Sequence, residues 1–427
     1  MVTGAAPARS TGTIDPGALD PLAVVVTGLG TTNPLGGDLA ATWRALRAGR
    51  CAVRLLDEPW AEEYRLAVRV AAPLARDAAR PLTPKERRRL DRASQCALLA
   101  AREAWAHAGS PEVDGQRLSV SVSPGMGLVR SVIDTWETLR GGGPRRVLPT
   151  AVPALMPNAP AAAVGIELGA RGGIHAPVSA CASGAEAIAY GADLISLGRA
   201  DVVVAGGTDA ALHPVTVAAF AAMRALSTRA DVTASRPFAP DRDGFVLGEG
   251  AGLLVLERAA HAKARGAQIL AVLAGSGVTA DAYDVARPEP SGAQQERALR
   301  LALERAGLAP GAVGHVNAHA TSTPAGDVVE ASVLTRTAPG AAVSATKSFT
   351  GHLLGGAGGL EAVLTVMALR ERWAPPTLLP AGVDPELAGL GLDVVGPQGR
   401  RLPGLKAAAS TSFGFGGHNV ALVFTRE

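Results

Sequence analysis

The chain has 427 residues, of which 48% are hydrophobic and only 4% aromatic, so it is long enough for two packed halves around a large interior. Its formal net charge of +3 is small for this length, which leaves nucleic-acid binding without support from composition. The three cysteines, Cys51, Cys96 and Cys181, lie far apart with no CxxC pair, which argues against a zinc cluster or a disulfide framework. These features favour an enzyme of the reducing cytoplasm.

The N-terminal segment has the composition of an unstructured leader. Residues 1–21 are rich in Gly, Ala, Pro, Ser and Thr and contain no continuous apolar run of the kind found in signal peptides. Elsewhere no apolar run approaches the roughly 20 residues needed to cross a bilayer. We therefore predict a disordered leader over residues 1–21 and expect neither secretion nor a membrane span.

Short apolar runs that end in glycine alternate with longer helical patterns along the chain. The runs predict strands over residues 22–30, 200–207, 252–257 and 269–275, and the patterns predict helices over 38–48, 92–108, 182–197, 294–306 and 360–370. Runs without polar alternation are typical of strands buried on both faces. The alternation predicts an α/β fold with mainly parallel sheets.

The sequence also shows weak signs of duplication. Each half opens with a strand that ends in a small-residue turn, VVVTGLGTT near Val24 and VLAGSGVTAD near Val272. Each half later carries a small-residue helix start beside a chemical group. We predict one half over 22–268 and another over 269–427, packed so that the two helix starts meet at a shared interface.

Cys181 lies between a strand-like segment, IHAPVSA, and a helical one, ASGAEAIAYGADLI. A thiol at a strand-to-helix junction faces free backbone N–H groups and the positive end of the helix dipole, which favour thiolate. By itself, a cysteine among alanines is more often a small core residue. Its assignment as a nucleophile therefore depends on the other segments.

Three further segments carry polar groups in glycine-rich surroundings. His319 ends a strand-like run in VNAHATSTPAGDVVE, and Lys347 and His352 lie five residues apart in SATKSFTGHLLGGAGGLE. The C-terminal TSFGFGGHNVALVF contains a glycine-rich turn that would by itself indicate an ordinary hairpin. A lone histidine is more often structural than catalytic, but four such segments in one chain indicate a catalytic site.

SACASG around Cys181, NAHATSTPAGD around His319, TKSFTGH around His352 and SFGFGGHN near the end occur together and in this order. In these motifs the chain resembles the β-ketoacyl-acyl-carrier-protein synthases over residues 22–427. It resembles the elongating type II class most and is similar to the branch that includes mycolate-type long-chain synthases. The resemblance implies a thiolase-like fold, a duplicated five-layer α-β-α-β-α arrangement, and a homodimer across the strand before the cysteine.

The resemblance also implies a decarboxylative condensation. Cys181 would accept an acyl chain from its carrier protein as a thioester, with the backbone N–H groups of Cys181 and Phe415 as the oxyanion hole. His319 and His352 would donate hydrogen bonds to the enolate left when malonyl-carrier loses carbon dioxide, while Lys347 adds positive charge. The carbanion then extends the chain by two carbons. No metal or separate cofactor is implied, because the substrates arrive on the phosphopantetheine arm of an acyl carrier protein.

Supporting roles follow from the same resemblance, although each of these residues also fits ordinary packing. They are Glu330 as the partner of Lys347, Asp327 as a second supporting acid, Thr321 and Thr323 as hydrogen-bond partners of the phosphopantetheine arm, Phe413 and Phe415 at the substrate with Phe415 as a gate, and Met126 in the acyl tunnel. The chain departs from many relatives at Phe349, Ala320, Asp284 and Pro124. These departures leave the central chemistry intact and leave chain length and gating open.

A cluster of cations lies in PLTPKERRRLDRASQ. Lys85, Arg88, Arg89 and Arg92 follow i, i+3, i+4, i+7 spacing, which predicts four cations on one helical face. Such runs are commonly just solvated surface. Lys85, Arg88 and Arg89, together with Arg224 in MRALSTR, nevertheless match basic docking residues of the elongating family, whose carrier proteins are acidic. An acyl carrier protein is therefore the expected partner.

Other classes fit less well. A Rossmann dehydrogenase is disfavoured because Asn33 stands where a third glycine should follow Gly28 and Gly30. A degradative thiolase needs a second catalytic cysteine, and none follows Cys181. A chain-length-factor subunit would lack the nucleophile. The alternative that stays open is a ketosynthase subunit of a type II polyketide or polyene synthase, working with a chain-length-factor partner.

Overall fold

The computed structural model describes residues 19–427, so residues 1–18 of the predicted leader lie outside the described part of the chain. The strands of the first half are β1 (Val24–Thr32), β4 (Leu118–Ser123), β5 (Ile174–His175), β6 (Val202–Asp209) and β7 (Gly250–Arg258). Those of the second are β8 (Ala271–Ala280), β9 (His315–Asn317), β10 (Ala342–Ser344), β12 (Asp393–Val394), β14 (Ala407–Gly414) and β15 (His418–Thr425).

These strands form two half-sheets with the same topology. The first runs β1-β7-β6-β4-β5, and the second runs β8-β15-β14-β9-β10 with β12 added at its edge. The halves join into one 11-stranded sheet where Val25 and Val26 of β1 pair with Val272 and Ala271 of β8. The matching order of strands confirms the duplicated fold that the sequence indicates.

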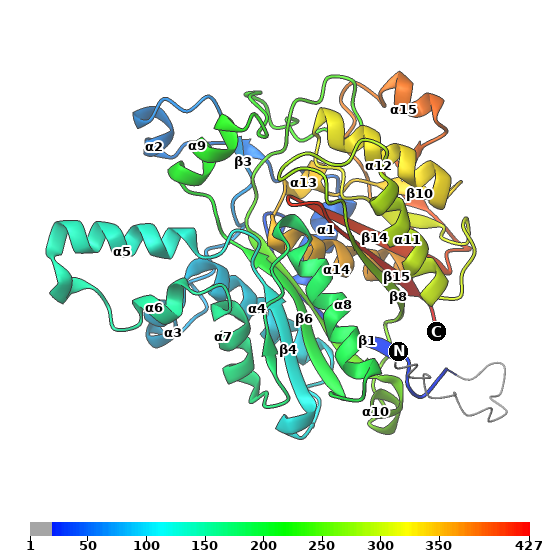
Figure 1. The fold of residues 1–427 in the computed structure, drawn as a ribbon, viewed down its shortest axis with the longest axis horizontal. Coiled ribbons are helices and arrows are strands. Elements are labelled where there is room, and N and C mark those ends of the chain that lie inside the picture. Colours follow the sequence, from blue (N-terminus) through cyan, green and yellow to red (C-terminus); the bar gives the residue numbers. More distant parts are fainter. Residues whose placement is uncertain (1–18) are drawn as a thin grey trace, which may run out of the picture.

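Helices form three layers around the half-sheets (Figure 1). On one outer face α4 (Arg92–His107) packs on β1 and β7, and α7 (Ala159–Leu168) packs on α4 and β4. On the other, α11 (Ala293–Arg305) packs on β8 and β15, and α12 (Pro324–Thr337) packs on α11. Two helices, α8 (Ser183–Ser196) and α14 (Gly355–Glu371), contact each other and strands of both half-sheets. The layers are therefore α-β-α-β-α, as predicted.

The nine predicted elements are all present, and their bounds differ by a few residues. The expectation of mainly parallel sheets is wrong, since β7 runs antiparallel to both β1 and β6, and β15 runs antiparallel to both β8 and β14. Parallel pairing is confined to the outer strands of each half, such as β4 with β6 and β9 with β14. Helices cover both faces of each half-sheet, so central strands are apolar throughout whichever way they run.

Close packing explains Gly28 and Gly30, the two glycines that resemble part of a nucleotide-binding motif. A Cβ at Gly28 would lie 2.1 Å from the carbonyl oxygen of Ala104, and one at Gly30 would lie 2.0 Å from that of Ala100. Both carbonyls belong to α4, so the glycines let this helix lie directly on β1.

The remaining helices and strands of the described chain lie outside the main layers. The helices are α1 (Leu39–Arg47), α2 (Pro59–Glu63), α3 (Pro84–Arg89), α5 (Val129–Gly142), α6 (Ala151–Leu155), α9 (Pro214–Ala222), α10 (Ala259–Ala264), α13 (Lys347–Thr350) and α15 (Pro385–Gly389), and the strands are β2 (Arg54–Leu55), β3 (Val70–Ala71), β11 (Trp373–Ala374) and β13 (Arg400–Arg401). The division predicted near residue 268 falls between α10 and β8.

Helix α5 projects from the body at the left of Figure 1 and contains no buried residue. No helix within residues 19–427 is long and apolar enough to cross a membrane.

Candidate active site

Cys181 lies in a single turn, Ala180–Ala182, that leads directly into α8. The residue is buried, with 8% of its surface exposed. The preceding residue, Ala180, has φ +50°, a left-handed conformation that costs a non-glycine residue about 1–3 kcal/mol. This sharp turn places the sulfur in the middle layer, where the two halves of the molecule meet.

The second half brings two imidazoles to the same place. His319 follows β9, His352 precedes α14, and their ring centroids lie 5.3 Å apart with the planes nearly perpendicular. Left-handed non-glycine residues lie beside them as well, Ser322 at φ +69° and Leu354 at φ +51°. Strained backbone therefore lies within three residues of Cys181, His319 and His352, a pattern typical of functional sites.

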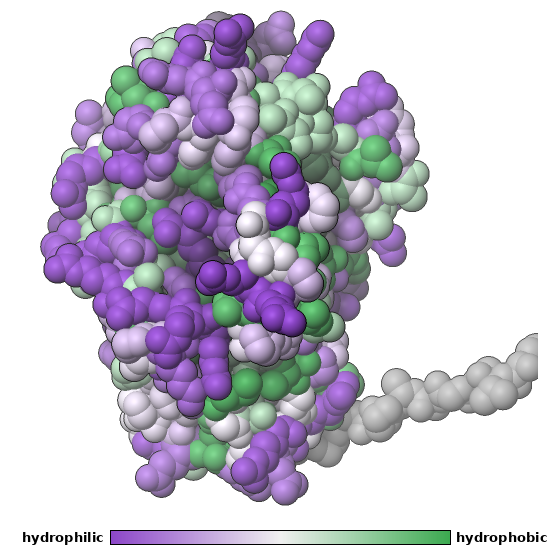
Figure 2. All heavy atoms as spheres, turned by 90° about the vertical axis from the view of Figure 1, so that its left-hand side faces the viewer, coloured by the Kyte–Doolittle hydropathy of each residue, from purple (hydrophilic) through white to green (hydrophobic). Residues whose placement is uncertain are grey.

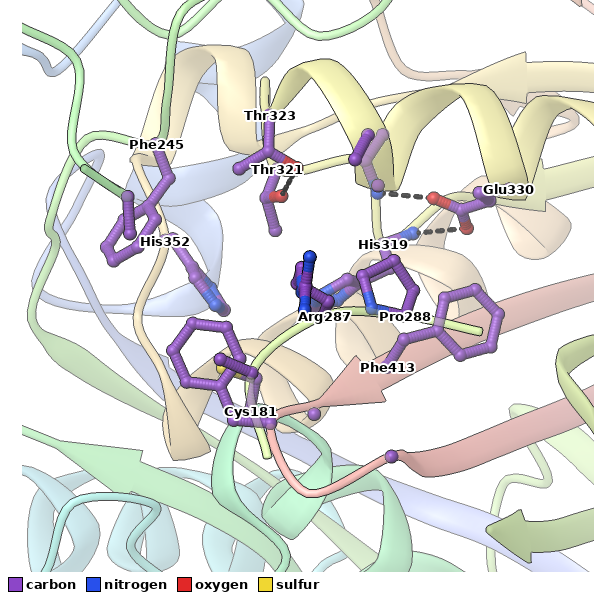
Figure 3. A pocket seen from close by; sticks show the side chains of 18 of the residues that line it. Cys181, Phe245, Arg287, Pro288, His319, Thr321, Thr323, Glu330, His352 and Phe413 are labelled. Carbon is purple, nitrogen blue, oxygen red and sulfur yellow. Dashed lines mark hydrogen bonds between the residues drawn. The ribbon is translucent and has the colours of Figure 1, made fainter. Parts of the chain in front are cut away.

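One cavity of about 340 Å³ opens onto Cys181, His319 and His352 (Figure 3). Phe413 packs edge-on against His319, and Phe245 packs edge-on against His352. Further lining residues predicted from the sequence are Glu330, Thr321, Thr323, Phe415 and Arg224. The hydroxyls of Thr321 and Thr323 are hydrogen-bonded to each other at 3.1 Å along the wall. The geometry thus collects side chains from both halves around one apolar chamber.

The thiol is protonated in the resting site. Burial raises the pKa of Cys181 to about 12, although the charge of Lys347 and the backbone N–H groups of Phe415 and Cys181 act in the opposite direction. The helix start was expected to favour thiolate, and in this site burial outweighs it. The backbone N–H groups of Phe415 and Cys181 both act on the sulfur. They are the two groups predicted to form the oxyanion hole.

Both imidazoles are neutral at physiological pH. Burial, reinforced by the positive charge of Lys347, holds the pKa of His319 and that of His352 well below the usual range. Within the described chain, Nδ1 of His319 and both ring nitrogens of His352 are buried without a hydrogen-bond partner. Each neutral ring has one N–H to donate, so the pair is suited to hold an oxyanion in the cavity.

Lys347 begins α13 and is 1% exposed. Its ammonium donates to Glu361 of α14, so the expectation that Glu330 is its partner is wrong. Glu361 sits 14 residues after Lys347, and the turn between α13 and α14 brings the two together. Burial raises the pKa of Glu361 to about 7 despite the lysine. The charge of Lys347 lowers the pKa of both histidines.

The two acids predicted to support the site, Glu330 and Asp327, accept hydrogen bonds from backbone N–H groups. Glu330 accepts hydrogen bonds from the N–H groups of His319 and Ala320, at 2.8 and 2.6 Å, and from the hydroxyl of Thr411 at 2.7 Å. Asp327 accepts from the N–H of Phe238 and from that of Ser322. Both are therefore placed to fix the loop that carries His319.

Three of the residues predicted to dock the carrier protein, Lys85, Arg88 and Arg89, lie on α3, which ends at Arg89. Leu90 is extended and Asp91 caps the next helix, α4, so the expectation that Arg92 continues the same helical face is wrong. Arg92 turns inward and donates to Glu249 at 3.0 and 3.2 Å. Lys85, Arg88 and Arg89 remain exposed, and Arg224 lies at the cavity instead of beside them.

Some residues of the site escape sequence reasoning. Glu361 and Asp209 are buried acids among mostly apolar residues of α14 and β6. An acid in such a segment was the available indication of a role. Phe220 and Phe245 line the cavity from a segment without any motif. Met126 does not line it but packs into the apolar cluster that contains Cys181 and Phe220.

Comparison with known proteins shows the family to which the chain belongs. The beta-ketoacyl synthase N-terminal domain matches residues 22–262, and the beta-ketoacyl synthase C-terminal domain matches residues 270–379. A Mycobacterium tuberculosis protein described as 3-oxoacyl-[acyl-carrier-protein] synthase 2 is 44% identical over 409 residues, 94% of this chain and 97% of that protein. A solved beta-ketoacyl synthase from Burkholderia phymatum STM815 has a TM-score of 0.87 at 36% identity and covers 95% of this chain and 99% of its own.

A second solved structure is a type II polyketide synthase acyl-carrier protein in complex with its ketosynthase, bound to the hexaketide. The matching chain has a TM-score of 0.86 at 30% identity, with 95% of this chain and 99% of that chain covered. A thiolase-like fold with a buried cysteine and two neutral histidines in one chamber defines a condensing acyltransferase. The chain belongs to the beta-ketoacyl synthase family. The predicted family, fold and enzyme class are thereby confirmed.

Proposed function

We propose that this enzyme condenses malonyl-[acyl-carrier-protein] with an acyl chain held on Cys181 and so lengthens fatty acyl chains by two carbons. The observation that carries the proposal is that Cys181, His319 and His352 open into one cavity. The 44% identity to a 3-oxoacyl-[acyl-carrier-protein] synthase 2 over nearly the whole chain supports the choice of substrate.

The first half-reaction transfers the acyl group. The sulfur of Cys181 attacks the thioester of the acyl-carrier, the C–S bond to the pantetheine breaks, and the thiol proton of Cys181 ends on the departing sulfur. Because burial keeps this thiol protonated, attack needs stabilisation as charge develops. The charge of Lys347 and the N–H groups of Cys181 and Phe415 supply it.

The second half-reaction makes the new carbon–carbon bond. The malonyl group loses carbon dioxide, and the electron pair of the broken bond forms an enolate whose oxygen accepts hydrogen bonds from His319 and His352. The enolate carbon then attacks the acyl thioester, and the C–S bond to Cys181 breaks. The sulfur leaves as thiolate and takes up a proton, which restores the resting thiol.

An acyl carrier protein is the proposed partner, and it would dock on the face that Figure 2 shows. Hydrophilic side chains cover much of the middle of that face. A groove beside α3 is lined by Arg88, Arg89, Arg130 and Arg146, together with the acids Asp77, Asp91 and Asp134. Exposed cations attract an acidic partner over several ångströms and raise the rate of encounter.

A homodimer is the proposed assembly. β5 is an edge strand, with Ile174 and Val178 exposed close by. α7 packs on β5, and α6 packs on α7. The arm formed by residues 129–156 continues from there and exposes large apolar side chains, namely Val132, Trp136, Leu139, Leu148, Val152 and Met156. A second copy that pairs at β5 would cover surface that is otherwise costly to leave in water.

The second candidate is a ketosynthase subunit of a type II polyketide pathway, in which a chain-length factor replaces the second copy. The likeness to the polyketide ketosynthase complex, at 30% identity, is the observation that favours it. We also expect a cytoplasmic enzyme, since the three cysteines are free thiols.

The proposal is tested with the purified chain, an acyl-carrier and malonyl-carrier. Cys181→Ala should abolish condensation and acyl labelling of the protein, whereas Cys181→Gln should keep malonyl decarboxylation, which needs the histidines and not the thiol. Cys96→Ala, which changes a fully buried cysteine in α4, is the control. Acyl transfer to Cys181→Ala, seen by intact-protein mass spectrometry, would refute the assignment.

A further inference from the structure

Asp209 is a buried acid to which the mechanism gives no role. It ends β6, the strand that lies in the middle of the first half-sheet against α8 and α14 (Figure 1). Its side chain is fully buried. A buried carboxylate that is neither paired with a cation nor exposed to solvent must be held by other donors, and those donors identify what it does.

All of its hydrogen bonds converge on one oxygen. Oδ2 accepts from the backbone N–H groups of Gly125 at 2.8 Å, Met126 at 3.3 Å and Gly355 at 2.8 Å. Gly125 and Met126 follow β4 in the first half of the molecule. Gly355 begins α14 in the second half, three residues after His352. One atom therefore connects the two halves at the site.

The backbone is closely packed around this carboxylate. A Cβ at Gly355 would lie 2.1 Å from the nitrogen of Gly125, and a Cβ at Gly207 would lie 2.0 Å from the carbonyl oxygen of Gly355. A Cβ at Gly184, three residues after Cys181, would lie 2.6 Å from the same oxygen. Backbone thus touches backbone among β6, α8 and α14, so a shift at this contact would move Cys181 and His352 relative to each other.

The charge of Asp209 also affects the pKa of the Cys181 thiol. It raises the pKa of Cys181, while Lys347 lowers it. Burial raises the pKa of Asp209 itself to about 7, the three N–H groups oppose that effect, and the carboxylate of Asp91 at the start of α4 adds to it. Its other oxygen, Oδ1, has no hydrogen-bond partner within residues 19–427. An amide could therefore replace the carboxylate without losing a contact.

We propose that Asp209 is a positioning residue for the condensation: its carboxylate fixes the loop beside Cys181 to the segment after His352, and its negative charge contributes to the field at the sulfur. The proposal rests on the roles of Cys181 and His352 proposed above. It adds a residue that touches neither substrate nor carrier and that sets both geometry and reactivity.

The two contributions are separated by two substitutions. In Asp209→Asn the amide oxygen can take the place of Oδ2 and keep all three hydrogen bonds, while the charge is lost. In Asp209→Ala both are lost. Thr208→Val is the matched control, because Thr208 is the adjacent buried residue of β6 and its hydroxyl donates to Ala93 of α4, away from the site.

The decisive measurement is the pH dependence of iodoacetamide labelling of Cys181, read by peptide mass spectrometry, which separates Cys181 from the other free cysteines, Cys51 and Cys96. Asp209→Asn should move this curve to lower pH and raise the labelling rate at pH 8 by roughly three- to tenfold, whereas Thr208→Val should not move it. Asp209→Ala should lower kcat for condensation by about tenfold or more, with little change in KM for the carrier-bound substrate.

An unshifted labelling curve for Asp209→Asn overturns the proposal, whether or not Asp209→Ala folds. Condensation by Asp209→Ala at the wild-type rate overturns it as well. Labelling does not depend on the condensation, so a wild-type enzyme that labels normally but fails to condense would count against the proposed function and leave this test intact.

Discussion

At the scale of single residues, burial has the largest effect on the protonation of Cys181 and of both histidines. It keeps Cys181 protonated and both histidines neutral, and it raises the pKa of Glu330 and Glu361. Neutral imidazoles are poor bases in this setting but good hydrogen-bond donors. The histidines are therefore better suited to stabilise an enolate than to remove a proton from the thiol.

Loss of either imidazole should affect the two half-reactions unequally. His319→Ala or His352→Ala should slow malonyl decarboxylation by roughly 100-fold or more, the usual effect of removing an oxyanion donor, and should leave measurable acylation of Cys181. Decarboxylation is followed by release of labelled carbon dioxide and acylation by mass spectrometry. His418→Ala, at the start of β15, is a control histidine. Equal loss of both half-reactions would contradict the division of roles.

The positive charge of Lys347 can be tested without leaving an unpaired buried acid. Lys347→Met combined with Glu361→Gln removes the whole ion pair. Because the lysine lowers the pKa of Cys181, its loss should raise that pKa further and slow alkylation of Cys181 at pH 8.5. Glu361→Gln alone, which keeps the lysine, should not slow it. Unchanged alkylation in the double variant would mean that Lys347 only fills space.

Sequence reasoning at this scale identified the nucleophile and both histidines as candidates, because each lies in a motif with its own glycines and hydroxyls. It assigned the wrong partner to Lys347. Glu330 and Glu361 are both acids a short distance along the chain from the lysine, and only the turn between α13 and α14 decides which one lies beside it. Asp209 went unnoticed because it is the last residue of an otherwise uncharged strand, β6, that carries no motif.

At the scale of elements, the N-cap residue Asp91 divides what looked like one basic helix. Asp91 accepts hydrogen bonds from the N–H groups of Ala93 and Ser94 and so starts α4 just after α3 has ended. A periodic spacing of cations cannot reveal such a break, because the i, i+3, i+4, i+7 pattern runs across it. The cations left on α3 form a smaller patch than predicted.

Reversing that patch should weaken docking without affecting chemistry. Arg88→Glu with Arg89→Glu should lower kcat/KM for carrier-bound substrate and reduce its dependence on salt, because the screened attraction is gone. Activity with a small acyl-thioester that lacks the carrier should stay nearly the same. Arg401→Glu with Lys406→Glu, two exposed cations of the second half, is the matched control. If both substrates suffer equally, α3 supports folding and the docking proposal fails.

The positions of strands and helices were predictable from the pattern of apolar residues. Long apolar runs mark buried strands, and apolar residues at helical spacing mark helices, whichever elements they pack against. Strand direction was not predictable, because β7 and β15 are covered on both faces just as parallel strands are. The projecting helix α5 also escaped prediction, because none of its residues is buried and no apolar face marks it.

At the scale of the whole molecule, the exposed apolar arm predicts a second copy. Light scattering on the purified enzyme should give twice the mass of the 43.1 kDa chain. Trp136→Glu, which places a charge on a side chain that is 56% exposed, should shift the enzyme toward monomer. Leu390→Glu changes an exposed apolar residue beyond α15 and should not. A wild-type monomer that gains activity only with a second protein would favour the polyketide alternative.

The duplication was visible in the sequence as two similar strand openings, and the matching strand order bears it out. The boundary near residue 268 stays a prediction. The sequence could not show how the halves are joined. The two half-sheets pair through two residue pairs of β1 and β8, and most of the remaining contact between the halves is made by α8 and α14 in the middle layer.

That middle layer limits how such an enzyme can diversify. Where α8, α14 and β6 touch, glycine backbones occupy the contact and even a methyl group would collide, so substitution there cannot adjust the reaction gradually. The loops around the cavity mouth, which carry Arg224, Arg287 and Pro288, face no comparable restriction. Changes in the preferred acyl chain are therefore expected to accumulate in these loops, while the junction beneath them stays the same across enzymes with different products.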